Sequence, residues 1–354
     1  MPKRDKLYLA FAAVFSAIIV LTFVFVQGSK GLVSFLSLVL SGWTLLFLVL
    51  IYAYPSFQSK IKSYLQSPQR MLIGLLATIF CPYVLYVVGN PTLLAIGLTE
   101  IAIYMLLPSF LLFLFMYFKK ANYYLDLLVF AILFFAFDHR LIKHIWGYPE
   151  GYSYVYNSLY LVVIMLYNYL VMRNIPDIGF SFAFKQDDIK ISILNLILII
   201  VIVLPLALIT GFVTPRTEVL PLYDAFISFF GIFLTIATIE ELAFRGIFLN
   251  ILIKITKNDK ISLVISSILF GLIHWDNTPV PDWRYILLAT IAGIPLGFLI
   301  GINEFRGRQT LITLFNTLMS LPTVVVGLFV FSLISRQGPA GSMGLLFTPA
   351  AMVI

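Results

Sequence analysis

Charged residues are scarce in this sequence of 354 residues. Asp, Glu, Lys and Arg make up 11% of the chain, whereas 61% of it is hydrophobic. A soluble domain carries about 25% charged residues, which form the polar surface that keeps it in water. The shortfall excludes an ordinary soluble domain and predicts a polytopic membrane protein.

Cysteine is almost absent, because Cys81 stands alone. It cannot form an intramolecular disulfide, and its apolar surroundings beside Pro82 predict a small buried core residue. The sequence also lacks a phosphate-binding glycine loop, a serine nucleophile motif and any nucleic-acid-binding element. We therefore attribute the net charge of +7 to loops at the membrane surface and expect no nucleic-acid partner.

Long apolar runs set the fold class. Lipid permits only α-helices or closed barrels, and these runs exceed the roughly 9–11 residues of a barrel strand. The sequence therefore predicts an all-α, multi-pass protein of the cell membrane with about 11 transmembrane helices. The predicted spans are 7–27, 32–54, 71–88, 93–118, 124–137, 154–172, 191–213, 222–253, 261–275, 285–302 and 310–334.

Basic residues are distributed unequally between the two sides of these spans. With the N-terminus inside, sixteen of the 23 Lys and Arg residues fall in cytoplasmic loops and six on the opposite side. Arg245 is left within a span. This bias predicts an N-in, C-out orientation, because Lys and Arg concentrate in cytoplasmic loops.

A polar segment rich in turn-forming residues, 174–190, divides the chain. We interpret residues 1–174 as an N-terminal six-helix membrane region of unknown role. Residues 175–335 form a second membrane domain that holds nearly all the unusual polar residues, and 336–354 form a C-terminal tail.

Two adjacent carboxylates and an arginine interrupt the apolar run 226–253. Glu241 and Arg245 are four residues apart, so on a helix they share a face and can form an ion pair. Glu240 points about 100° away from Glu241. Neutralisation of Glu241 would leave Glu240 in a low-dielectric cavity as a general base that activates water. A buried pair that only fixes helix packing is the alternative.

Two polar side chains in later apolar runs are further candidates. His274 ends the run 261–275, which follows the glutamate run after one short loop, so the two helices are expected to be neighbours. Asn316 lies in the run 310–334 and, in the same bundle, would stabilise an oxyanion. The structural alternatives are an interfacial anchor for His274 and a helix-linking hydrogen bond for Asn316.

Together these residues resemble the motifs of a known family. Glu240-Glu241-x-x-x-Arg245, then Phe270-x-x-x-His274, then a late Asn316 look like the CAAX prenyl protease 2 and bacteriocin-processing (CPBP, Abi) family of intramembrane proteases. The resemblance covers roughly residues 175–330. It implies a helical bundle with a cavity that opens to the membrane and the cytosol.

The resemblance also implies a role for each residue. Glu240 and His274 would activate water for attack on a peptide bond. Glu241 and Arg245 would support the site, and Asn316 would help to hold the oxyanion. The partners implied are the lipid bilayer and a membrane protein or lipidated peptide as substrate. No cofactor is firmly predicted; zinc is possible by family convention, with Glu240 and His274 as ligands only if a metal is bound.

One position departs from the family pattern. The third motif usually has a histidine four residues before the asparagine, where this chain has Ile312. Isoleucine binds no metal and donates no side-chain hydrogen bond, which argues against a full zinc site and removes one oxyanion donor. Three interpretations stay open: an intramembrane endopeptidase, a catalytically degenerate immunity- or chaperone-like membrane protein, and a proton-coupled transporter. The absence of a repeat between the two halves counts against the transporter.

Other polar residues in or near the spans are interpreted more simply. Glu100 is an intramembrane acid with no partner that the sequence identifies, and Asp126 is a charge at the end of a helix. His139 and His144, five residues apart, are poorly spaced for one helical face and are placed in an outside loop. The tyrosines between residues 148 and 169 are interpreted as an interfacial belt.

Ile312→His is expected to raise peptide hydrolysis. A lost oxyanion donor costs about 2.7–4 kcal/mol, or roughly a hundred- to a thousandfold in rate, and the substitution restores one. Cleavage of a membrane-anchored peptide by the purified variant and the natural protein measures the effect. An unchanged rate in a folded variant would show that another group already fills this role.

Overall fold

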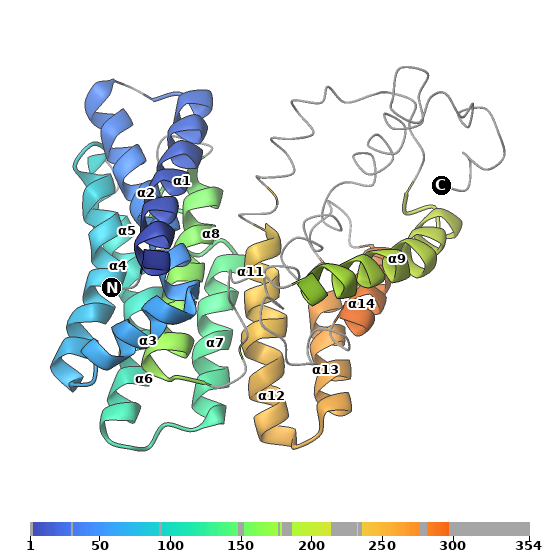
Figure 1. Ribbon diagram of the computed structural model, residues 1–354. Coiled ribbons are helices and arrows are strands. Elements are labelled where there is room, and N and C mark those ends of the chain that lie inside the picture. The colour runs from blue at the N-terminus through green and yellow to red at the C-terminus, as the bar shows by residue number, and fades with distance from the viewer. Residues whose placement is uncertain are drawn as a thin grey trace.

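Helices make up every regular element in the computed structural model, which describes residues 3–29, 31–91, 94–147, 152–175, 178, 186–213, 232, 236–275 and 282–296 (Figure 1). This confirms the all-α class. The earlier elements are α1 (Lys3–Gln27), α2 (Leu32–Ala53), α3 (Pro55–Tyr64), α4 (Pro68–Val87), α5 (Leu94–Glu100), η2 (Ile101–Leu106), α6 (Leu107–Tyr117), α7 (Tyr123–Asp138), α8 (Tyr152–Met165) and η3 (Leu166–Met172). The later elements are α9 (Gln186–Ile209), α11 (Thr238–Glu240), η5 (Glu241–Phe248), α12 (Leu249–Thr256), α13 (Asp259–Leu272) and α14 (Trp283–Leu296). The elements labelled η are π-helices.

Five helical segments among the described residues are long and apolar enough to cross a membrane. They are Lys3–Gln27, Leu32–Ala53, Pro68–Val87, Leu94–Tyr117 and Tyr152–Met172. With 16 and 14 residues, α7 and α13 fall short of the roughly 20 residues of a full span. The protein is a polytopic helical membrane protein, and the count of eleven spans and the orientation stay predictions.

A tight hairpin joins α12 to α13. The α12 helix ends at Lys257, whose φ of 56° lies in the left-handed region that terminates helices. The Asn258 side chain then caps α13 by accepting a hydrogen bond of 3.1 Å from the Ile261 amide. The hairpin brings the helix that carries the glutamates beside the helix that leads to His274.

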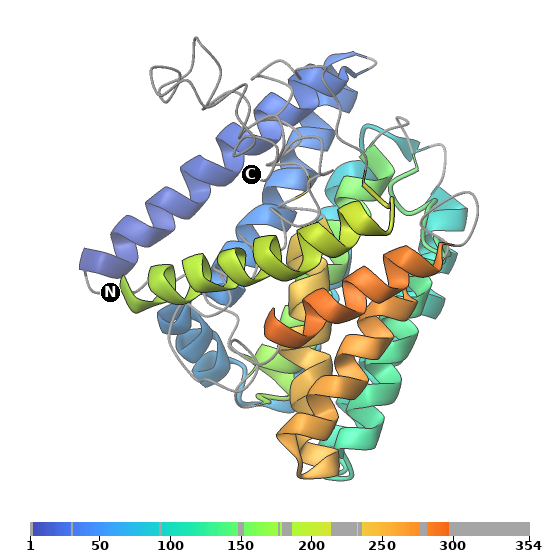
Figure 2. The same cartoon turned by 90° about the vertical axis from the view of Figure 1, so that its right-hand side faces the viewer.

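Close packing of α13 on α14 depends on Gly271. A Cβ atom at this position would collide with Thr290 Oγ1 and would lie 2.7 Å from the Ile286 carbonyl oxygen. In Figure 2, α14 and α9 run side by side across the α12–α13 hairpin, and both pairs α13–α14 and α9–α14 are in contact. These four helices form one wall of the second region.

The α8–η3 helix lies at the centre of the first region, and almost all of its apolar stretch, Tyr152–Met172, is buried. The expected interfacial tyrosine belt is therefore wrong for Tyr152, Tyr156, Tyr160, Tyr167 and Tyr169, which are buried. Their hydroxyl groups donate to backbone carbonyls: Tyr156 to Leu38 at 2.6 Å, and Tyr160 to Ile79 at 2.9 Å. Each phenol thereby satisfies its polar atom while its ring fills the core.

The two regions share one hydrophobic core. Phe134 of α7 packs edge-on against Phe244 of η5, with ring centroids 5.1 Å apart, and Phe130 stacks on Phe248 at 5.5 Å. Phe244 also meets Phe270 of α13 at 5.5 Å. The first region is therefore packed directly on the helix that carries the paired glutamates.

The packing adds to one sequence interpretation and corrects another. Asp126 lies in the first turn of α7, as predicted, but its carboxylate is fully buried and accepts two hydrogen bonds of 2.6 Å from the Arg173 guanidinium, which joins α7 to the end of η3. Cys81 is not a core residue, because the α4 face that carries it is exposed. A helix in lipid accommodates a small thiol on its outer face as readily as in its core.

The intramembrane acid Glu100 has a partner that the sequence did not identify. Its carboxylate accepts hydrogen bonds from the His144 and Ile145 amides at 3.0 and 3.1 Å, and it contacts His144 Nδ1 at 2.5 Å. These bonds attach the segment after α7 to the end of α5. His144 therefore has a structural role, while His139 lies beside Asp138 at 3.5 Å.

Removal of one partner of the Asp126–Arg173 pair is expected to destabilise the first region. Asp126→Ala leaves a half-buried guanidinium without its carboxylate, which costs about 3–5 kcal/mol. Thermal unfolding of the purified variant in detergent measures the loss. The double variant Asp126→Ala/Arg173→Met serves as the control and should lose less, whereas equal losses would show that the pair is not coupled.

Candidate functional site

The sequence Glu240-Glu241 stands where an α-helical turn changes into a π-helix. Glu240 is the last residue of α11, and η5 begins at Glu241. Short π-helical segments inside α-helices occur frequently at functional sites, because the wider turn changes the direction of the side chains. Here the two neighbouring carboxylates enter different environments.

Glu241 and Arg245 form an ion pair inside the protein. Their side chains are 0% and 4% exposed, and Arg245 Nη1 donates to Glu241 Oε1. The guanidinium carbon also lies 4.6 Å from the centroid of the Phe270 ring, within the range of a cation–π contact. The spacing of four residues predicted this pair, and the structure brings the two side chains together.

Glu240 instead faces His274. Glu240 Oε1 lies 3.7 Å from His274 Nε2, and the side chains are 17% and 6% exposed. This distance is longer than a hydrogen bond, but one water at about 2.8 Å from both atoms fits beside them. The two residues come from neighbouring helices, as their order in the sequence predicted.

A backbone contact fixes the His274 ring. His274 Nδ1 lies 2.8 Å from the carbonyl oxygen of Phe270, one helical turn earlier. A carbonyl oxygen only accepts hydrogen bonds, so we assign the proton to Nδ1, and the Nε2 lone pair then faces Glu240 in the neutral ring. The rings of Phe270 and Tyr285 enclose the imidazole, at 5.0 and 4.7 Å between centroids.

A cavity of about 500 Å³ contains Glu240 and His274. Its wall is mainly apolar, with side chains from α9, α13 and α14 such as Ala207, Phe270 and Ala289. The volume falls within the range of small-ligand and substrate sites, and an apolar wall with a few polar groups is typical of them. The cavity therefore has room for a segment of extended peptide next to the glutamate.

The first region contributes part of this cavity, which the sequence did not predict. Phe134, Phe137, Asp138, Arg140 and Tyr154 all line it. Arg140 has a φ of 55°, in the left-handed region, and lies in the turn that follows α7. The sequence does show a cluster of polar residues, 138–140, at the end of the apolar run 124–137. Only the packing of α7 on η5 brings this cluster to Glu240.

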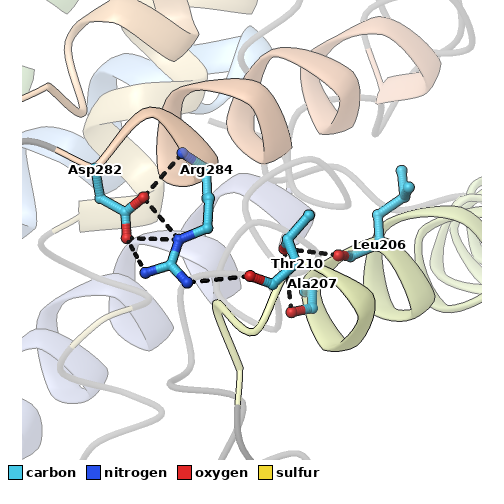
Figure 3. A network of polar contacts seen from close by, with 5 residues as sticks. All are labelled: Leu206, Ala207, Thr210, Asp282 and Arg284. Carbon is cyan, nitrogen blue, oxygen red and sulfur yellow. Dashed lines mark hydrogen bonds and ion pairs between the residues drawn. The ribbon is translucent and has the colours of Figure 1, made fainter.

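A clamp joins the end of α9 to the start of α14, and both helices supply residues to the cavity wall (Figure 3). Arg284 forms hydrogen bonds with Asp282, including one of 2.7 Å from Nη2, and its Nη1 donates to the Thr210 carbonyl at 3.1 Å. The hydrogen bonds from Arg284 lower the pKa of the Asp282 carboxyl below its usual range. Beside this clamp, the Phe212 and Tyr285 rings meet at 5.2 Å.

Two positions that the sequence singled out, Asn316 and Ile312, lie outside the described residues. Among the described residues, Glu240 and His274 are the candidate metal ligands, and no group of three or more His, Cys, Asp or Glu residues could hold a metal ion. A catalytic zinc site has three protein ligands and one open position. The described residues do not fit such a site, and we derive no step through a metal.

Fold and site together define a helical membrane protein with a buried acid–imidazole pair in a cavity between its helices. Residues 221–352 match the family described as Type II CAAX prenyl endopeptidase Rce1-like, so the chain carries a domain of this CAAX prenyl endopeptidase (CPBP) family. The match contains Glu240, Glu241, Arg245 and His274, and it confirms the family that the sequence motifs indicated.

Curated relatives match only short stretches of the chain. A probable anion ABC transporter permease protein of Haloferax volcanii is 39% identical over 69 residues, which cover 20% of this chain and 30% of that protein. The tungstate uptake system permease protein TupB of Peptoclostridium acidaminophilum is 46% identical over 67 residues, or 19% and 29% of the two chains. This chain thus spans less than a third of the curated relatives. No solved structure matches it.

Arg284→Gln is expected to lower peptide hydrolysis. The variant loses the charge-assisted contacts with Asp282 and Thr210, and Tyr285 then no longer holds the His274 ring in place. A displacement of about 1 Å can cost roughly a hundredfold in rate. Cleavage of a membrane-anchored peptide measures the loss, with Trp283→Phe at the neighbouring exposed position as control. An undiminished rate for Arg284→Gln would contradict the positioning role.

Proposed function

We propose that this protein is an intramembrane endopeptidase of the cell membrane that cleaves a lipid-modified or membrane-anchored protein. The observation that supports this function most directly is the approach of Glu240 Oε1 to His274 Nε2, at 3.7 Å inside the cavity. A carboxylate and an unprotonated imidazole nitrogen that face one water are suited to general-base catalysis.

The first step of the proposed reaction is the activation of water. The water donates one hydrogen bond to Glu240 and the other to His274 Nε2, so its oxygen lone pair faces the cavity. As the oxygen bonds to the scissile carbonyl carbon, Glu240 accepts the proton. The carbonyl π electrons move to the oxygen, and a tetrahedral oxyanion forms.

The second step breaks the peptide bond. The oxyanion re-forms the carbonyl, the carbon–nitrogen bond breaks, and the proton on Glu240 passes to the leaving amine nitrogen. The products are a new carboxyl terminus and a new amino terminus, and Glu240 returns to its carboxylate form. We assign oxyanion stabilisation to Asn316, as the family resemblance implies.

The Glu241–Arg245 pair supports this chemistry indirectly. An unpaired arginine next to Glu240 would form its own ion pair with that carboxylate and weaken it as a base. Because Arg245 is paired with Glu241, the carboxylate oxygens of Glu240 can accept hydrogen bonds from water. The buried pair also fixes the helix at the turn where Glu240 leaves it.

Two other functions are alternatives to the hydrolase. The short similarities to permease proteins favour a transporter in which Glu240 and Glu241 relay protons. Ile312 favours a catalytically degenerate, immunity- or chaperone-like membrane protein. The packed acid–imidazole pair favours the hydrolase, because neither alternative requires an imidazole nitrogen directed at the carboxylate.

Glu240→Gln is expected to reduce proteolysis about a hundred- to ten-thousandfold, the usual contribution of a general base. The amide keeps the size of the side chain but cannot accept the proton of water. Processing of a membrane-anchored peptide library by purified protein in proteoliposomes measures the rate.

Asp259→Asn is the matched control, because this carboxyl group is exposed at the start of α13 and remote from the cavity. It should process the library at the rate of the natural protein. Full activity of Glu240→Gln would exclude the hydrolase mechanism. No turnover by the natural protein, with substrate binding retained, would support the degenerate alternative.

A further inference from the structure

The cavity lies at one end of four helices, two of which run toward it and two away from it. It is lined by residues at the end of α7, near the start of α8, at the start of the α11–η5–α12 helix and at the end of α13. Phe137, Tyr154, Glu240 and His274 mark these four ends. Because α7 and α13 end at the cavity whereas α8 and α11 begin there, the shared end is a property of the fold and not of one helix.

The opposite ends of the same helices carry a cluster of basic residues. The turn before α7, the end of η3 and the α12–α13 hairpin supply them, and in Figure 1 the α6–α7 and α12–α13 turns lie together at the lower edge of the molecule. The members of this basic end are Lys119, Lys120, Arg173, Lys254, Lys257 and Lys260, of which Arg173 is paired with Asp126. At the cavity end, the described part of the chain has Arg140, Lys143 and Arg284, of which Arg284 is paired with Asp282.

The depth of the catalytic pair can be measured from this basic end. Glu240 precedes Lys254, and His274 follows Lys260, by fourteen residues each. At a rise of 1.5 Å per residue, both side chains lie about 20 Å from the basic end. The hydrocarbon core is about 30 Å thick, and His274 follows the end of α13 directly, so for His274 the shorter route to water, about 10 Å, leads away from the basic end.

Lys and Arg in short loops concentrate on the cytoplasmic side of a membrane protein. We propose that the cavity opens toward the side of the membrane away from the cytoplasm. Its substrates are then membrane-anchored proteins whose cleavable segment lies on that outer side, and not lipidated proteins presented from the cytosol. The family resemblance implied a cavity open to the cytosol; the position of the site relative to the basic end favours the other side. The substrate part rests on the proposed function, whereas the direction of opening does not.

Single cysteines at the two ends of α7 test the direction. Cys81→Ser removes the natural thiol, and Lys120→Cys and Lys143→Cys then form a matched pair, because each replaces an exposed lysine in a turn next to α7. Intact cells that produce the full chain are treated with a charged, membrane-impermeant maleimide. Labelling is expressed relative to the same cells after lysis.

We expect Lys143→Cys to label equally in intact and lysed cells, and Lys120→Cys to label at least tenfold more after lysis. A third variant, Ala207→Cys, places the thiol in the cavity wall itself and should react in intact cells as well. Preferential or equal labelling of Lys120→Cys in intact cells would overturn the proposal. Labelling of Lys143→Cys only after lysis would overturn it too.

The same variants separate this proposal from the proposed function. Labelling requires no turnover, so Glu240→Gln added to each cysteine variant should leave the pattern unchanged. If the protein proved not to be a hydrolase but the labelling pattern were as expected, the outward opening of the cavity would still be supported. A reversed pattern in a protein that still cleaves its substrate would refute the direction alone.

Discussion

The buried ion pair between Glu241 and Arg245 is the interaction on which the site depends. Each charge placed in the membrane interior costs about 2.5–3.5 kcal/mol even on the lenient insertion scale. The pair lies inside the protein with Phe270 over the guanidinium, so neither charge faces lipid. The helix can therefore carry Arg245 within the membrane. The adjacent Glu240 lies in the cavity, where it faces His274.

Packing of the first region on the second has a direct consequence for the site. The phenylalanines of α7 contact Phe244, which lies between Glu241 and Arg245, and Phe248, which lies about one turn beyond Arg245. The same contact carries Asp138, Arg140 and Tyr154 to the cavity. The first membrane region therefore forms part of the wall of the site.

Local features of the site were predictable from the sequence, because they depend on residue spacing along one helix or across one short loop. The Glu241–Arg245 pair follows from a spacing of four, and the approach of His274 follows from the α12–α13 hairpin. Long-range pairs were not predictable: Glu100 meets His144 across 44 residues, and Asp126 meets Arg173 across 47. The tyrosines of α8 and η3 were predicted at the membrane interface for a related reason. A buried tyrosine and an interfacial one have the same sequence pattern, and only the distant carbonyl that accepts the hydroxyl hydrogen bond distinguishes them.

We propose that Glu240 and His274 activate water without a metal. Elemental analysis of the purified natural protein, combined with its peptide hydrolysis rate before and after chelation, tests this mechanism. We predict substoichiometric metal and a rate that chelation leaves unchanged. Stoichiometric zinc, with hydrolysis that is lost on its removal and restored on its return, would contradict it.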